Sequence, residues 1–132
     1  MNLPLIIANS IIFIAFFIHV IMGDKEFKLI EPSLSANNYL KKQEVWTMAR
    51  GAFHIISVDI LCLNILLLII NFTNLIPNER FILKLISIYL FIWAVAFMLI
   101  VLVSKNFQNK LIKLPQWILF SLLSGLLYWA SL

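Results

Sequence analysis

The sequence predicts an all-α integral membrane protein, a four-helix transmembrane bundle with a long first cytoplasmic loop. Of its 132 residues, 63% are hydrophobic and only 12% are charged, whereas soluble domains are about half apolar and a quarter charged. The mean hydropathy is +1.01. Apolar stretches of about 20 residues, the length that crosses a bilayer as a helix, recur along the chain. We therefore expect lipid to surround most of its surface.

The expected spans are residues 3–22, 51–70, 81–103 and 114–132, forming a single membrane domain over 1–132. The first stretch has no basic residue before it, is too long for a signal peptide and has no small-residue cleavage site after it, so it is expected to remain as a span. Pro4, Pro77 and Pro115 lie near three of the expected starts. Proline suits a first helical turn, where its missing N–H is not needed.

Basic residues predict the orientation. Arg80 and Lys84 follow the second connection, whereas eight basic residues lie in or beside the first and third: Lys25, Lys28, Lys41, Lys42, Arg50, Lys105, Lys110 and Lys113. Because cytoplasmic loops carry the excess of Lys and Arg, we expect both termini in the periplasm of a bacterial inner membrane. This topology accounts for the net charge of +4 without a nucleic-acid partner. The expected partner is the lipid bilayer, with a homo-oligomer or a larger membrane complex left open.

The first connection, residues 23–50, is longer than a simple helical hairpin needs. Apolar residues alternate with lysines over residues 25–30, which favours a segment lying among lipid headgroups and attracted to anionic lipid. The single cysteine, Cys62, cannot form an intrachain disulfide, which argues against a membrane thiol oxidoreductase.

Two histidines form the sharpest pattern in the chain. His19 lies about one turn before the end of the first span and His54 about one turn after the start of the second, each on the order of 5 Å below the same interface. Arg50, His54 and Ser57 share one helix face by their spacing. We therefore expect a polar pocket of His19, Arg50, His54 and Ser57 that binds a ligand or cofactor.

This pocket admits several interpretations. Two facing imidazoles could ligate haem iron or a divalent metal, could transfer protons, or could lock the two helices together by hydrogen bonds. A metal site normally has three or four ligands, and no ligand-spaced motif accompanies the histidines. The cofactor therefore stays unknown, with haem or a divalent metal at His19 and His54 as one alternative.

Asp59 and Asn64 are intramembrane polar residues of the second span. An ionised carboxylate near the midplane costs roughly 2.5–3.5 kcal/mol on insertion scales, so such residues mark functional sites or hydrogen bonds between helices. Asp59 lies about 140° around the helix from His54, so the two do not touch directly. A proton-coupled transporter that uses Asp59 is therefore an alternative function.

The residues His19-x3-Gly23, followed by Asp24 and Lys25, and then Arg50-x3-His54-x2-Ser57 resemble a family of small bacterial four-span membrane proteins. That family carries His-x3-Gly-Glu-Arg after its first span and Arg-x2-Trp-His-x2-Ser at the start of its second. The resemblance covers residues 19–57. Here Asp24, Lys25 and Phe53 replace the glutamate, arginine and tryptophan. The resemblance implies a four-span fold, and it implies no established activity.

The sequence carries no nucleophile–base–orienter set, phosphate loop or metal-protease motif. An enzyme is therefore the less favoured expectation. The favoured one is a binding or accessory role for a small polytopic inner-membrane protein. The two alternatives are a haem- or metal-binding redox protein that uses His19 and His54, and the proton-coupled transporter that uses Asp59.

Overall fold

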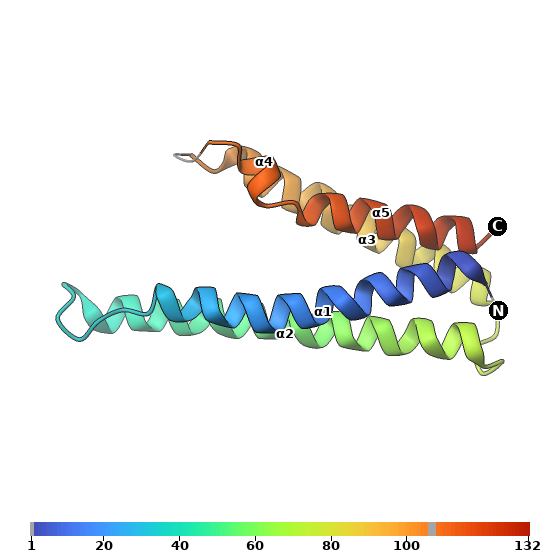
Figure 1. The fold of residues 1–132 in the computed structure, drawn as a ribbon, viewed down its shortest axis with the longest axis horizontal. Helices are drawn as coiled ribbons and strands as arrows, with labels where there is room; N and C mark the ends of the chain where they lie inside the picture. Colours follow the sequence, from blue (N-terminus) through green and yellow to red (C-terminus); the bar gives the residue numbers. More distant parts are fainter. Residues whose placement is uncertain (1, 106–107) are drawn as a thin grey trace. The chain divides into compact units, whose positions relative to one another are not determined.

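The computed structural model describes residues 2–105 and 108–132, and these residues form helices and no strands (Figure 1). The elements, in chain order, are α1 (Leu3–Leu29), α2 (Tyr39–Phe72), α3 (Glu79–Val103), α4 (Lys110–Lys113) and α5 (Gln116–Ala130). The all-α prediction is confirmed for this part of the chain.

Helices α1, α2 and α3 have 27, 34 and 25 residues and are long and apolar enough to cross a membrane. They contain the first three expected spans, and α1 and α2 extend beyond theirs. Helix α5 has only 15 residues, which corresponds to about 22 Å of rise, less than the hydrocarbon thickness of about 30 Å. The structure therefore supports a helical membrane protein with three spans of crossing length.

The first connection is much shorter than the sequence predicts. Helix α1 continues to Leu29 and α2 begins at Tyr39, so only residues 30–38 connect them. Most of the expected long loop is helical. An ion pair between Asp24 and Lys28 (3.2 Å), at i,i+4 spacing, supports the last turns of α1. Asn38, in the left-handed conformation (φ 57°), directly precedes α2.

Helices α1 and α2 form an antiparallel hairpin over residues 9–68, which is one of two compact units. Its buried positions include Ile12 on α1 and Ser57, Asn64 and Leu67 on α2. Large apolar side chains on the opposite faces are exposed, as expected for helices that lipid surrounds.

The second unit joins the first turns of α1, up to Ala8, to the chain from Ile69 onward. Helices α3 and α5 pack together through Ser87 and Ser124, whose hydroxyl groups each donate to the other residue's carbonyl at 2.8 Å. In the same unit, the side-chain amide of Asn2 donates to the carbonyl of Ala130 at 2.8 Å. Reciprocal serine bonds of this kind satisfy buried hydroxyls between apolar helices.

Candidate functional site at the loop end of the hairpin

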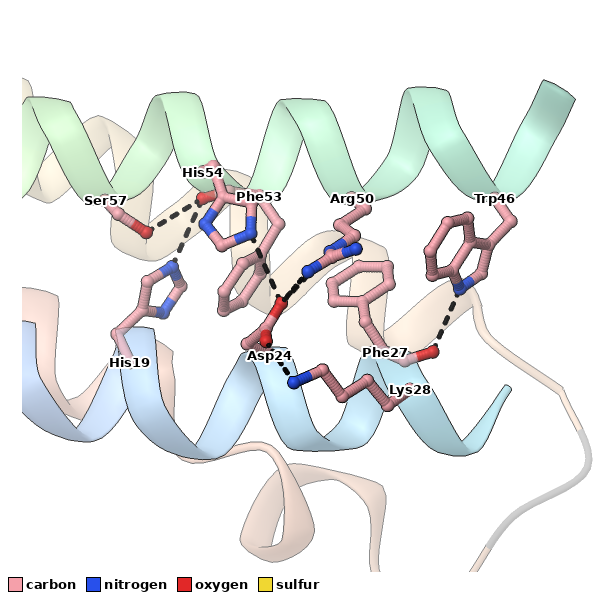
Figure 2. A network of polar contacts seen from close by, with 9 residues as sticks. All are labelled: His19, Asp24, Phe27, Lys28, Trp46, Arg50, Phe53, His54 and Ser57. Carbon is pink, nitrogen blue, oxygen red and sulfur yellow. Dashed lines mark hydrogen bonds and ion pairs between the residues drawn. The ribbon is translucent and has the colours of Figure 1, made fainter. Parts of the chain in front are cut away.

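Asp24 is the centre of a group of charged residues at the loop end of the hairpin (Figure 2). Its Oδ1 accepts hydrogen bonds from Nη2 and Nε of Arg50 at 2.6 and 3.0 Å. The same oxygen lies 3.5 Å from Nε2 of His54, and Oδ2 lies 3.2 Å from Nζ of Lys28. We call Asp24, Lys28, Arg50 and His54 the Asp24 cluster. It joins α1 to α2 by charge-assisted bonds.

Beside this cluster, the Phe53 ring of α2 packs against α1. The imidazole of His19 stacks on it with 3.9 Å between ring centroids and an interplanar angle of 17°. Phe27 meets its edge at 5.2 Å. Gly23 makes this approach possible, because a Cβ there would lie 1.9 Å from Cζ of Phe53. We call His19, Gly23, Phe27 and Phe53 the Phe53 stack.

The structure brings the two predicted histidines to the same ring but gives them different polar partners. His19 Nε2 lies 3.5 Å from the carbonyl oxygen of Phe53 and, because a carbonyl only accepts, is the donor there. His54 packs edge-on to Phe53 at 5.7 Å and turns its Nε2 toward Asp24. The two imidazoles therefore contact the same aromatic ring and bind different polar groups.

The other predicted site residues fall in different places. Ser57 is buried and donates its hydroxyl to the Phe53 carbonyl at 3.2 Å, so it joins the site through the backbone. Arg50 turns toward α1 and binds Asp24. Asn64 is buried farther along α2, and Asp59 is half-buried on the same helix.

Within residues 2–105 and 108–132, no three His, Cys, Asp or Glu side chains gather closely enough to hold a metal ion. His19 and His54 remain the only histidines of the chain, and both already contact protein acceptors. A ligand bound through their Nε2 atoms would have to replace those contacts.

The electrostatics of the site centre on one carboxylate among several cations. Asp24 lies beyond the apolar stretch that ends at Met22, and its side chain is 24% exposed. The hydrogen bonds from Arg50, and then from Lys28, hold the pKa of the Asp24 carboxyl below its ordinary value. The carboxylate form is therefore favoured, and the cluster as a whole keeps an excess of positive charge.

Sequence reasoning assigned no site role to four residues that build this region. Asp24 is the hub, Phe53 and Phe27 form the aromatic contacts, and the indole Nε1 of Trp46 donates to the Phe27 carbonyl at 2.9 Å. The guanidinium of Arg50 lies 5.3 Å from the centroid of the Trp46 ring, within the range of a cation–π contact. The continuation of α1 as a helix beyond the expected first span, which the sequence pattern did not predict, was needed to place them.

The fold is that of an α-helical protein with the long apolar helices of membrane proteins. Searches for similar proteins found no matching family model, curated protein or solved structure. The geometry of the site is therefore the main basis for a functional argument.

Proposed function

We propose that this chain is a non-enzymatic, four-span protein of a bacterial inner membrane with a binding or accessory role. In this proposal the loop end of the α1–α2 hairpin, with His19, Arg50, His54 and Ser57, lies on the cytoplasmic side. The basic residues that flank the first and third connections support this orientation. Helix α5 would be the fourth span, in agreement with the family resemblance of residues 19–57.

One observation carries the proposal: the polar residues of the two sequence patterns contact one another across the hairpin. Asp24 binds Arg50, and His19 and Ser57 both reach the Phe53 carbonyl. Such contacts fix the position of two helix ends before any ligand arrives. Preorganisation of this kind lowers the entropic cost of binding, so it supports a surface that binds a partner or a small molecule.

The exposure of the long helices supports an accessory role as well. Only 22% of the residues in the apolar windows of α1, α2 and α3 are buried inside the chain. Lipid or the helices of a partner must cover the rest, since exposed apolar surface of this extent marks membrane or protein contact. A homo-oligomer and a larger membrane complex both satisfy this requirement.

Native mass spectrometry of the protein released directly from its own membrane tests the proposal. We expect the 15.3 kDa chain to retain a bound molecule or another subunit, and the Arg50→Ala and His54→Ala variants to lose it. A bare monomer from wild-type membranes would contradict a binding or accessory role. A Soret band in the absorption spectrum of the same sample would instead favour haem at His19 and His54.

A further inference from the structure

A hollow of about 540 Å³ opens at the loop end of the hairpin, next to the Phe53 stack. Its wall is apolar and includes Phe27, Val45, Trp46 and Ala49, with two lysines, Lys41 and Lys42, as the charged residues of the lining. None of the described residues that line it is acidic. A site of this size, apolar with a few placed polar groups, has the general character of a small-molecule site.

The contacts at the loop end hold the wall of this hollow in place. Trp46 is fixed by its bond to the Phe27 carbonyl and by the Arg50 guanidinium beside its ring. Arg50 is in turn held by Asp24 at 2.6 Å. The hollow is therefore preformed, and the Asp24 cluster supports it.

The position of the hollow along α2 sets the environment of its ligand. Helix α2 has 34 residues and a length of about 51 Å, so about 20 Å extends beyond a hydrocarbon core of about 30 Å. Trp46 lies one turn beyond Arg50, about 6 Å by helical rise. Indole rings favour this level of a bilayer, where headgroups meet acyl chains.

Charge selects among the lipids found at that level. Lys41 is paired with Glu44 at 3.0 Å, whereas Lys42 forms no ion pair within the part of the chain that the structure describes. An acyl chain fits the apolar wall, and a phosphate group with net negative charge fits the lysine edge. Basic residues at the headgroup level attract anionic lipids in this way.

We propose that the hollow lined by Phe27, Trp46, Lys41 and Lys42 binds one anionic phospholipid, with its acyl chain against the aromatic wall and its phosphate at the lysines. This inference rests on the proposed binding role and names the ligand class. A neutral lipid, an apolar peptide and a second copy of the chain are the other possible occupants, and the experiment distinguishes them.

The experiment uses Trp46 as the reporter, in a full-length chain that carries Trp93→Phe, Trp117→Phe and Trp129→Phe. The protein is placed in phosphatidylcholine bilayers that contain a small, equal fraction of either brominated phosphatidylglycerol or brominated phosphatidylcholine. We expect the brominated phosphatidylglycerol to associate about fivefold more strongly, because one lysine near the surface contributes on that order. Equal quenching by the two lipids would overturn the proposal.

Matched variants distinguish lipid binding in the hollow from general attraction of anionic lipid to surface charge. Lys41→Gln with Lys42→Gln should reduce the preference to about one, whereas Lys25→Gln with Lys113→Gln, which removes the same charge outside the hollow, should leave it unchanged. Ala49→Leu, which fills the hollow without changing charge, should reduce quenching by both lipids. Equal losses in the two lysine pairs, or no effect of Ala49→Leu, would contradict a defined site.

A second measurement keeps the test independent of the tryptophan substitutions. Native mass spectrometry of the wild-type chain in a mixture of the two lipids should show one retained phosphatidylglycerol, lost in the Lys41→Gln, Lys42→Gln variant. Retention of phosphatidylcholine at the same level would overturn the lipid proposal. If a different subunit or molecule is retained from native membranes, the binding role stands while the lipid assignment fails.

Discussion

The close packing of α1 against α2 at Gly23 depends on the absence of a side chain there. An added Cβ would lie 1.9, 2.6 and 2.8 Å from three atoms of the Phe53 ring. That ring cannot move freely, because His19 stacks on one side and Phe27 meets its edge. A methyl group at position 23 therefore has to displace an entire aromatic contact.

We predict that Gly23→Ala lowers the free energy of unfolding by about 1–3 kcal/mol through this overpacking. The measurement is reversible unfolding in mixed micelles. Gly51→Ala is the matched control, because nothing lies within 4 Å of its added Cβ, and it should be neutral or slightly stabilising. In a Phe53→Leu background the cost of Gly23→Ala should shrink. An undiminished cost there would show that the ring is not the cause.

Asp24 gives the hairpin a dependence on acid pH. The pKa of its carboxyl is lowered by the bonds from Arg50 and then Lys28. Its contribution to stability is therefore complete above the unfolded value of about 3.9. As the pH falls through the lowered folded value, the carboxylate gains a proton and the contribution is lost.

We predict that Asp24→Asn lowers the free energy of unfolding at pH 7, and only modestly, because both partners keep some access to water. The difference from wild type should stay constant down to about pH 4, near the unfolded pKa, and should shrink only as the pH falls further, through the lowered folded pKa. Glu44→Gln, in the exposed pair with Lys41, is the control and should show neither effect. A difference that does not shrink at all as the pH is lowered below about 4 would argue against an ionic contribution from Asp24.

At the scale of the element, the hairpin has one regular antiparallel register. Its cross-helix contacts join His19 to Phe53, Asp24 to Arg50 and Phe27 to Trp46. The equal depth of the two histidines, which the sequence predicts, is enough to set this register. Counting outward from them places Asp24 against Arg50, provided that both helices continue beyond the apolar stretch.

The rest of the site could not be derived from the pattern, for physical reasons. The charged residues 24–28 suggest a loop by composition, and only the Asp24–Lys28 pair at helical spacing indicates that α1 continues. Nothing in the spacing shows that Phe53 inserts between the histidines, because this depends on side-chain packing at Gly23.

Helix α5 shows in the same way that spacing alone does not identify the buried face of a helix. Ser121 and Gly125 are small residues four apart, a spacing typical of helix contacts. Both are exposed, and α5 buries Ser124 instead.

The same antiparallel register, continued toward the other end of the hairpin, places Asn9 of α1 opposite Asn64 of α2, to within one residue. Both are buried, with 6% and 4% exposure. Among residues 2–105 and 108–132, neither polar atom of the Asn9 amide, nor Oδ1 of Asn64, has a hydrogen-bond partner. Unpaired amide atoms in an apolar environment cost about 1–3 kcal/mol.

We therefore predict that Asn9→Leu raises the free energy of unfolding by about 1–2 kcal/mol, since the new side chain has a similar size and no polar atoms to satisfy. The same mixed-micelle unfolding measures it, with Asn2→Leu as the contrasting variant. The side-chain amide of Asn2 donates to the carbonyl of Ala130, so its replacement by leucine loses this bond and should destabilise the fold. Destabilisation by Asn9→Leu would mean that the amide binds a water or a ligand in the membrane.

For the whole molecule, the decisive question is whether α5 crosses the bilayer. Three spans would put the termini on opposite sides, and four would put them on the same side. Helix α5 rises about 22 Å, but Pro115 and Ser131 extend it at both ends, and a bilayer can thin locally to match a short span. Trp117 and Trp129 lie near its two ends, where aromatic residues anchor spans to the interfaces.

We predict that both termini face the periplasm, because the basic residues around the first and third connections outnumber those at the second by eight to two. Reporter fusions at Leu132 should be active only with the periplasmic reporter, and fusions after Val103 only with the cytoplasmic one. Replacing Lys105, Lys110 and Lys113 by glutamine should weaken this orientation, whereas replacing Arg80 and Lys84 should not. A C-terminus that is cytoplasmic together with a periplasmic N-terminus would limit the protein to three spans and leave α5 at the interface. A cytoplasmic N-terminus would place the Asp24 cluster and its hollow in the periplasmic leaflet.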